Sequence, residues 1–142
     1  MEPTTAMPIV PEGRPINILI VDDSAMMRLM LKRVTGLAGV PIGTIYEAAN
    51  GQEAIAVLER YEIDALFTDI NMPVMTGVEL LKAISKQERY HNLLRVIIST
   101  DGSAARREEV SDLQVKMYVE KPFRPEVMRD VLCELAAGTA TR

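Results

Sequence analysis

Five short apolar runs, each followed by a segment with helical spacing, constrain the fold of this chain more than any other feature. Residues 16–21 are apolar except for Asn17, and such a continuous run predicts a strand buried on both faces of a parallel sheet. The other predicted strands are residues 44–49, 65–68, 96–98 and 115–119. Five strands that alternate with five helices predict an α/β fold, in which right-handed crossovers cover both faces of the sheet.

The predicted helices begin at residues that favour helix starts. Asn50 and Thr76 each precede a glutamate at the spacing of a capping box. The fourth helix is polar, and Val110 and Leu113 are expected to be its main apolar anchors. The five predicted helices span about 24–35, a segment from 50, a segment from 76, about 102–113 and about 125–136.

Composition narrows the class of protein. The chain has 142 residues, of which 48% are hydrophobic, and this suffices for one domain with a sizeable core. A formal net charge of −4 argues against nucleic acid as the main partner, because phosphate binding needs a basic face. The single cysteine excludes an intramolecular disulfide and fits a reducing compartment. No apolar run reaches the length of a membrane span and no secretory signal pattern is present, so we expect a cytoplasmic protein without membrane insertion.

The ends of the chain differ from its centre. Four prolines and a glycine lie within residues 1–15, which are expected to form a disordered leader. Residues 16–137 are expected to form one domain, and residues 138–142 a frayed tail.

Polar side chains follow four of the five predicted strands. Asp22 and Asp23 follow the first strand, Asp69 the third, Ser99 the fourth and Lys121 the fifth. In parallel sheets, ligands bind beyond the carboxyl ends of the strands, near the point where the strand order switches. The sequence therefore predicts that these residues form a single site.

The residue types at this site indicate phosphoryl chemistry. Three carboxylates held close together repel one another, and a divalent cation relieves that repulsion. All-oxygen ligands with water favour Mg²⁺, with Mn²⁺ as an alternative. An aspartate beside such an ion can act as a nucleophile and accept a phosphoryl group. Lys121 and a hydroxyl would then neutralise the phosphoryl oxygens, and Ser99 offers this hydroxyl, with Thr100 as the second candidate.

Five motifs in order resemble the receiver domains of two-component response regulators, of the single-domain chemotaxis CheY type. Together they cover about residues 16–137. The resemblance implies a doubly wound, flavodoxin-like fold with strand order 2-1-3-4-5 and five helices. The motifs are residues 18–28 (ILIVDDSAMMR), 47–54 (EAANGQEA), 69–77 (DINMPVMTG), 96–100 (VIIST) and 119–123 (VEKPF).

The resemblance also implies a role for each site residue. Asp69 would be the phosphoacceptor, and Asp23 and Asp69 would bind Mg²⁺ directly. The backbone carbonyl of Asn71 would be a third ligand, and Asp22 would act partly through water. Lys121 would contact the phosphoryl group, and the peptide bond that follows it would be cis.

Further residues would transmit the signal and set its lifetime. Ser99 would be the switch hydroxyl and Tyr118 the switch aromatic, while Thr100 would take the position of a small residue that controls access. Asn71 and Asp101 would tune dephosphorylation, and they predict a short phosphoryl lifetime. One departure stands out: the family often has a Gly-Ala pair before the fifth strand, where this chain has residues 114–116 (QVK).

These implications lead to one expected function and two alternatives. The expected protein is a monomeric switch, not an enzyme, that takes its phosphoryl group from a histidine kinase. The fourth helix, fifth strand and fifth helix would bind an output protein such as a flagellar motor component. The first alternative is a phosphorelay intermediate or phosphate sink that passes the group to a histidine phosphotransfer protein. The second is a Mg²⁺-dependent phosphatase of the haloacid dehalogenase type, disfavoured because Asn71 lacks the acidic side chain that such enzymes carry two residues after the nucleophile.

Overall fold

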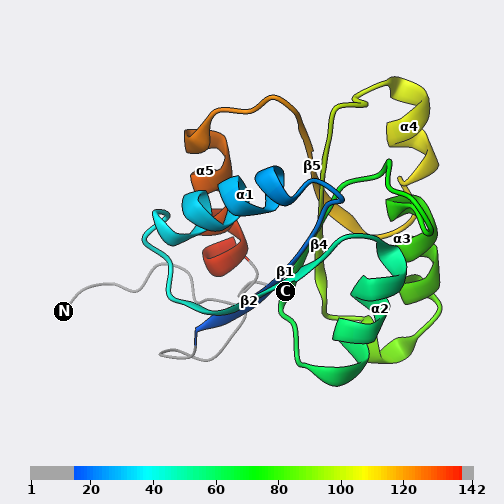
Figure 1. Cartoon of the computed structure of the whole chain (residues 1–142), viewed down its shortest axis with the longest axis horizontal. Helices are drawn as coiled ribbons and strands as arrows, with labels where there is room; N and C mark the ends of the chain where they lie inside the picture. Colours follow the sequence, from blue (N-terminus) through cyan, green and yellow to red (C-terminus); the bar gives the residue numbers. More distant parts are fainter. Residues whose placement is uncertain (1–14, 139–142) are drawn as a thin grey trace.

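Strands and helices alternate along the whole of the described chain (Figure 1). The computed structural model describes residues 15–138, so the expected leader and tail lie outside the described residues except for Pro15 and Gly138. Within that range, no helix combines the length and the apolar character needed to cross a membrane. The elements are β1 Ile16–Val21, α1 Ala25–Gly36, β2 Ile42–Ala48, α2 Gly51–Arg60, β3 Ala65–Thr68, α3 Gly77–Ser85, the 3₁₀ turn η1 Glu88–Tyr90, β4 Leu94–Ser99, α4 Ala104–Glu109, β5 Val115–Glu120 and α5 Pro125–Gly138.

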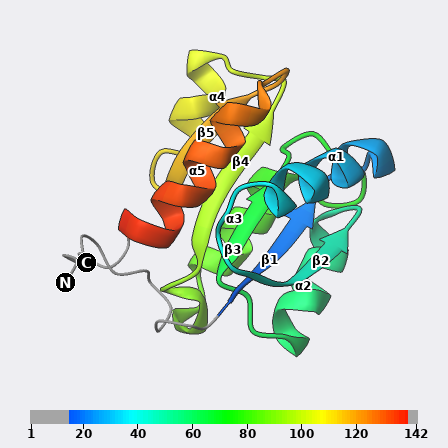
Figure 2. The ribbon, with the colours of Figure 1, turned by 90° about the vertical axis from the view of Figure 1, so that its left-hand side faces the viewer.

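The five strands form one parallel sheet in the order β2-β1-β3-β4-β5, which confirms the doubly wound fold. Helices α1 and α5 cover one face, as Figure 2 shows, and α2, α3 and α4 lie on the other. Helix α1 leads from β1 to β2 on one face and α2 leads from β2 to β3 on the other, so the strand order reverses between β1 and β3. Ligand sites of such sheets form at this reversal.

Strand β1 shows why its apolar run is continuous. Ile18 and Ile20 pack toward α1 and α5, whereas Leu19 and Val21 pack toward α2 and α3. These side chains are at most 1% exposed, so neither face of the strand tolerates a polar residue. Burial on both faces is the reason that the run lacks the alternation typical of a half-exposed strand.

Three strands are longer than predicted, and the smallest difference is in β5, which includes Glu120. Strand β2 begins at Ile42 rather than residue 44, because Ile42 pairs with Ile16 at the start of β1. Strand β4 spans Leu94–Ser99 rather than 96–98, and it includes the buried Arg95. The guanidinium of Arg95 donates hydrogen bonds to the carbonyl oxygens of Tyr90 and Leu93, which is how a charged residue is accommodated inside a strand.

Helix α4 is shorter than predicted and ends at Glu109 instead of continuing to residue 113. Val110 and Leu113 are buried as expected, but they anchor the turn that follows the helix. The chain then reverses at Gln114, whose φ of 61° lies in the left-handed region. The departure from the family pattern before the fifth strand therefore coincides with a backbone conformation that favours glycine.

Candidate phosphoacceptor site

Backbone hydrogen bonds between neighbouring strands continue one residue beyond the strand ends, and they position the residues of the site. The N–H of Asp22 donates to the carbonyl of Ala48, and the N–H of Asp69 donates to the carbonyl of Val21. On the other side, the N–H of Lys121 donates to the carbonyl of Ser99 at 2.8 Å. Each side chain therefore starts from a fixed point at the carboxyl edge of the sheet, as the sequence predicted.

Lys121 links two of the predicted acids. Its Nζ lies 2.9 Å from Oδ2 of Asp22 and 3.0 Å from Oδ2 of Asp69. The side chains are only 9%, 3% and 11% exposed in the order Lys121, Asp22, Asp69, so water screens these charges weakly. Burial opposes the charge of the lysine, but the hydrogen bonds to Asp22 and Asp69 outweigh burial and raise the pKa of its ammonium group.

The remaining oxygens of these two acids are also engaged. Oδ1 of Asp22 accepts a hydrogen bond from the N–H of Ser24 at 2.9 Å, and Oδ1 of Asp69 accepts one from the N–H of Ile70 at 2.7 Å. These bonds hold both carboxylates in one orientation. An acceptor group fixed in this way loses little conformational freedom when it reacts.

Three carboxylates converge closely enough to share one metal ion. Asp22, Asp23 and Asp69 each offer an oxygen, and these oxygens lie within 4.8 Å of one another. The donor set is all oxygen, and Asp23 is exposed to water, a combination that fits Mg²⁺. The predicted use of the Asn71 carbonyl as a further ligand stays a prediction, and Asn71 is exposed.

The two candidate hydroxyls differ in their surroundings. Ser99 is fully buried at the end of β4, and its Oγ accepts a hydrogen bond from the N–H of Asp101 at 3.1 Å. Thr100 is exposed to solvent. The buried hydroxyl therefore lies at the strand end that also positions Lys121, which favours Ser99 as the residue that contacts a phosphoryl group.

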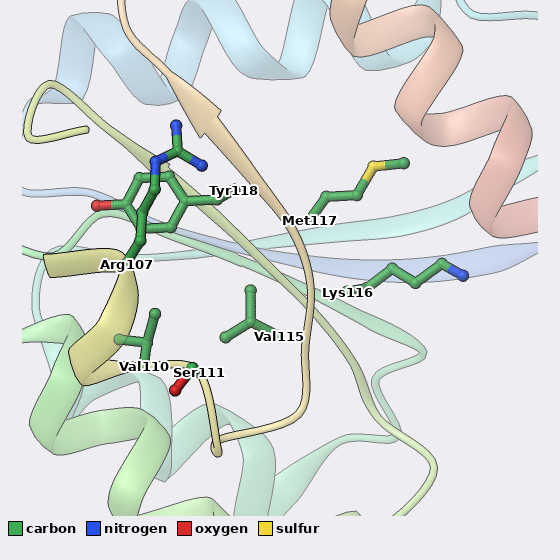
Figure 3. Close-up of a pocket in the computed structure, with 7 residues that line it drawn as sticks. All are labelled: Arg107, Val110, Ser111, Val115, Lys116, Met117 and Tyr118. Atoms are coloured by element: carbon green, nitrogen blue, oxygen red, sulfur yellow. The ribbon is translucent and has the colours of Figure 1, made fainter. Parts of the chain in front are cut away.

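Tyr118 connects β5 to the loop after Ser99. Its hydroxyl donates a hydrogen bond to the carbonyl of Asp101, and Arg107 lies over its ring with the guanidinium carbon 4.4 Å from the ring centroid (Figure 3). Burial raises the pKa of the phenol, and the charge of Asp101 adds to this effect. Because of this hydrogen bond, a movement of the loop that contains Asp101 would act directly on Tyr118.

The Asp101 side chain points toward the first turn of α4. Its carboxylate accepts hydrogen bonds from the N–H of Ser103 and from Nε of Arg106, at 3.1 and 3.2 Å. Hydrogen bonds with Ser103, followed by the one from Arg106, lower the pKa of Asp101. The role of Asp101 in tuning the phosphoryl lifetime stays a prediction, and its carboxylate also binds the N–H of Ser103, the residue that caps α4.

Three residues near the site were not assigned a role from the sequence. Arg28 donates from Nη1 to the carbonyl of Asp22 at 2.6 Å and from Nε to Glu47, so it steadies the loop after β1. Arg107 is exposed on α4, and its guanidinium group lies over the ring of Tyr118. A Cβ at Gly77 would overlap the carbonyl oxygen of Asp69 and would lie 2.9 Å from Cα of Ile70.

Only some of these three contributions could have been found from the sequence. Gly77 belongs to the motif that begins at Asp69, and a glycine there signals close backbone approach. The contact between Arg107 and Tyr118 joins α4 to β5, and no pattern within either segment indicates it. The peptide bond between Lys121 and Pro122 is cis, as the resemblance implied.

Comparisons with known proteins agree with this geometry. The family model described as the response regulator receiver domain matches residues 18–132. A chemotaxis protein CheY homolog of Campylobacter jejuni is 33% identical over 127 residues, which cover 89% of this chain and 95% of the relative. The CheY of Thermotoga maritima is 35% identical over 116 residues, covering 82% and 93% of the two chains.

Solved structures show the same likeness. The chemotaxis response regulator CheY4 of Vibrio cholerae superposes with a TM-score of 0.77 at 31% identity, covering 86% of this chain and 99% of that one. A CheY-like receiver domain of Methanospirillum hungatei, at 23% identity and a TM-score of 0.75 over 85% and 93% of the chains, adds support for the fold alone. With its parallel sheet, its acids at the carboxyl edge and its lysine between them, this chain belongs to the response regulator receiver family of two-component signalling and is CheY-like.

Proposed function

We propose that this chain is a phosphorylation-controlled switch in which Asp69 accepts a phosphoryl group from a histidine kinase. The observation that carries the proposal is the position of Lys121, whose ammonium group lies between Asp22 and Asp69. A buried cation at hydrogen-bond distance from the acceptor carboxylate is suited to the charge that develops on a transferring phosphoryl group. As in receiver domains generally, the output is a signal and not a released product.

Each residue has a defined part in the proposed transfer. A carboxylate oxygen of Asp69 attacks phosphorus, the bond from phosphorus to the donor histidine nitrogen breaks, and that nitrogen keeps the electron pair. The ammonium of Lys121 and the hydroxyl of Ser99 donate to two phosphoryl oxygens. A Mg²⁺ ion held by Asp23, Asp69 and the Asn71 carbonyl, with Asp22 acting through water, would supply the remaining charge neutralisation. The raised pKa of Lys121 favours the charged form that this role needs.

The signal then passes to the surface formed by α4, β5 and α5. Contact between Ser99 and the phosphoryl group would shift the loop that contains Asp101, and Tyr118 would respond through its bond to the Asp101 carbonyl. The phosphoryl group changes the equilibrium only by as much as it favours one state over the other. The proposed readout is a preference of this surface for an output protein, in chemotaxis or motility.

The proposed setting is a monomer in the cytoplasm, where a kinase can reach it. The resemblance assigns Asn71 and Asp101 to the ordering of the attacking water, so the proposed phosphoryl lifetime is short. A lifetime of hours in the presence of Mg²⁺ would contradict this part of the proposal. Reversible transfer from Asp69 to a histidine phosphotransfer protein, without binding of an output protein, would favour the phosphorelay alternative.

A direct test uses a small phosphodonor. We expect incubation with acetyl phosphate and Mg²⁺ to add one phosphoryl group, measured by intact mass, and chelation of the metal to prevent the addition. Asp69→Asn should gain no mass, whereas the exposed control Asp112→Asn should behave like the wild type. Absence of a mass gain in the wild-type protein would remove the proposal.

A further inference from the structure

Arg28 lies near the start of α1 and has no part in the proposed phosphoryl transfer. Its Nη1 donates to the carbonyl oxygen of Asp22 at 2.6 Å, and its Nε donates to Oε1 of Glu47 at 2.9 Å. The side chain is only 18% exposed, so both contacts are partly sheltered from water. One guanidinium group therefore joins a carboxylate of β2 to the backbone between two residues of the acid cluster.

The carbonyl of Asp22 belongs to the peptide unit that carries Asp23. The six atoms of a peptide unit lie close to one plane, so a hydrogen bond to this carbonyl also restrains the bond from N to Cα of Asp23. The other end of Asp22 is held as well, because its N–H donates to the carbonyl of Ala48. The direction in which the Asp23 side chain leaves the backbone therefore depends on the bond from Arg28.

Asp23 has less direct support than the two other acids of the cluster. Asp22 and Asp69 each accept hydrogen bonds on both carboxylate oxygens. Asp23 is exposed and forms no ion pair within residues 15–138, yet its oxygen lies within 4.8 Å of theirs. The backbone that Arg28 holds is therefore what brings this carboxylate to the cluster.

Glu47 holds the guanidinium group from the side of β2. Its two carboxylate oxygens accept hydrogen bonds from Arg28 and Lys32, each at 2.9 Å. The bond from Lys32, followed by the one from Arg28, lowers the pKa of Glu47, so the carboxylate is charged at neutral pH. Lys32 alone would tie α1 to β2, and the further contact of Arg28 with the Asp22 carbonyl is not needed for that purpose.

We propose that Arg28, held by Glu47, is a positioning residue for the Mg²⁺ site: its bond to the Asp22 carbonyl sets the direction from which Asp23 binds the ion. The planar fork of an arginine suits this task, because it donates to two fixed acceptors at once. Groups that orient metal ligands commonly change metal affinity by about 10- to 100-fold when they are replaced. The inference rests on the proposed function, which supplies the ion, but it requires no phosphoryl transfer.

The direction of the effect separates positioning from charge. Arg28 is a cation near a site that would bind a cation, so repulsion alone predicts tighter metal binding when its charge is removed. Loss of positioning predicts weaker binding. Lys32 is the matched control, because it donates to the same carboxylate but not to the Asp22 carbonyl.

Binding of Mn²⁺ to the full chain, without a phosphodonor, tests the inference. Electron paramagnetic resonance measures the free Mn²⁺, and competition gives the affinity for Mg²⁺. We expect Arg28→Gln to weaken Mn²⁺ binding about tenfold and Lys32→Met to bind at least as tightly as the wild type. Arg28→Lys keeps the charge but loses the fork, so it should also bind more weakly than the wild type.

A double substitution shows whether the effect acts through Asp23. In an Asp23→Asn background, measured at higher Mn²⁺ concentrations, Arg28→Gln should change the affinity by less than about twofold, because the carboxylate that it positions is gone. Circular dichroism and thermal melting without metal check that every variant folds. If Arg28→Gln does not fold, the comparison of Arg28→Lys with Lys32→Met decides the question.

The outcomes separate the inference from the function on which it rests. Unchanged or tighter Mn²⁺ binding in Arg28→Gln, wild-type affinity in Arg28→Lys, or the same loss in Lys32→Met would overturn the inference. A loss that persists in full in the Asp23→Asn background, or absence of Mn²⁺ binding in the wild type, would do the same. If Arg28→Gln weakens Mn²⁺ binding as expected but acetyl phosphate adds no phosphoryl group to the wild type, the positioning role stands and the proposed switch fails.

Discussion

Lys121 carries the charge that allows Asp22 and Asp69 to lie side by side in a largely buried place. Its two hydrogen bonds, of 2.9 and 3.0 Å, join strands that are far apart in the sequence. Removal of one partner from such an arrangement leaves buried charge without compensation, which costs more than the original pair contributes. The residue that serves the proposed chemistry therefore also affects the stability of the fold.

The first prediction concerns the alkaline side of the stability profile. The pKa of Lys121 is raised in the folded state, so its stabilising contribution is complete below the unfolded pKa of about 10.4 and is lost as the pH rises through the higher folded value. We expect Lys121→Met to be less stable by about 3 kcal/mol at neutral pH and to lose less stability between neutral and strongly alkaline pH. Urea unfolding across this range measures the effect.

Lys116→Met is the matched control, because Lys116 is an exposed lysine on the same strand. It should keep the pH profile of the wild-type protein. If the free energy of unfolding changed with pH in the same way for Lys121→Met and the wild type, the two hydrogen bonds would not raise the pKa of Lys121.

The second prediction concerns Gly77, which packs against the backbone of Asp69. A Cβ at this position would overlap the Asp69 carbonyl oxygen, so Gly77→Ala should displace the phosphoacceptor loop and destabilise the protein by about 3 kcal/mol. Gly36→Ala is the control, since nothing lies within 4 Å of a Cβ there and alanine favours the helix. Denaturant unfolding should separate the two, and similar stabilities for both variants would contradict the close approach.

Among the secondary structure elements, α4 is held in place by polar contacts. None of its residues is buried, and its N-cap is Ser103, whose hydroxyl accepts a hydrogen bond from the N–H of Arg106. Arg106 pairs with Asp101, and Arg107 lies over Tyr118. An element with so little apolar burial is among the easiest parts of a domain to move, which suits a helix on an output surface.

The sequence predicted which helices and strands are present more accurately than it predicted the residues at which they begin and end. Strand β1 and the gathering of Asp22, Asp69, Ser99 and Lys121 follow from apolar runs and the rule for parallel sheets, which need only short stretches of sequence. The length of β4 was underestimated because a buried arginine is accommodated by carbonyls outside the strand. The length of α4 was overestimated because apolar residues three apart fit a turn as well as a helix.

The third prediction follows from the turn between α4 and β5. Gln114 has a φ of 61° and an exposed side chain, so Gln114→Gly should remove left-handed strain and stabilise the protein by about 1 kcal/mol. Gln52→Gly, at an exposed position of α2, should instead cost about 1 kcal/mol. Thermal and urea unfolding measure both changes, and the same sign for the two variants would exclude strain at Gln114.

In the molecule as a whole, the residues that stabilise the fold and the residues of the proposed signalling site lie on different parts of the sheet. Its two faces are packed with apolar side chains, whereas its carboxyl edge collects three acids and one lysine. Lys121 compensates Asp22 and Asp69, but Asp23 forms no ion pair within residues 15–138. Three acids against one neighbouring lysine leave negative charge at this edge, which the proposed cation would neutralise.

The fourth prediction is that bound Mg²⁺ raises the melting temperature of the protein, whereas the Asp23 carboxylate lowers it when the metal is absent. An ion that binds only the folded state stabilises it by about 2.7 kcal/mol at a hundred times its dissociation constant, so the melting temperature of the wild type should rise with Mg²⁺ concentration. Asp23→Asn removes one of the three repelling carboxylates, so we expect it to melt at a higher temperature than the wild type when metal is chelated. The same variant should lose most of the Mg²⁺-dependent increase, because an amide binds the ion more weakly than a carboxylate.

Asp112→Asn, an exposed acid outside the cluster, should change neither the melting temperature without metal nor the increase with Mg²⁺. A Mg²⁺ response that survives in Asp23→Asn would mean that the ion is held elsewhere, and a lower melting temperature of the metal-free variant would mean that the three acids do not repel one another in the folded protein.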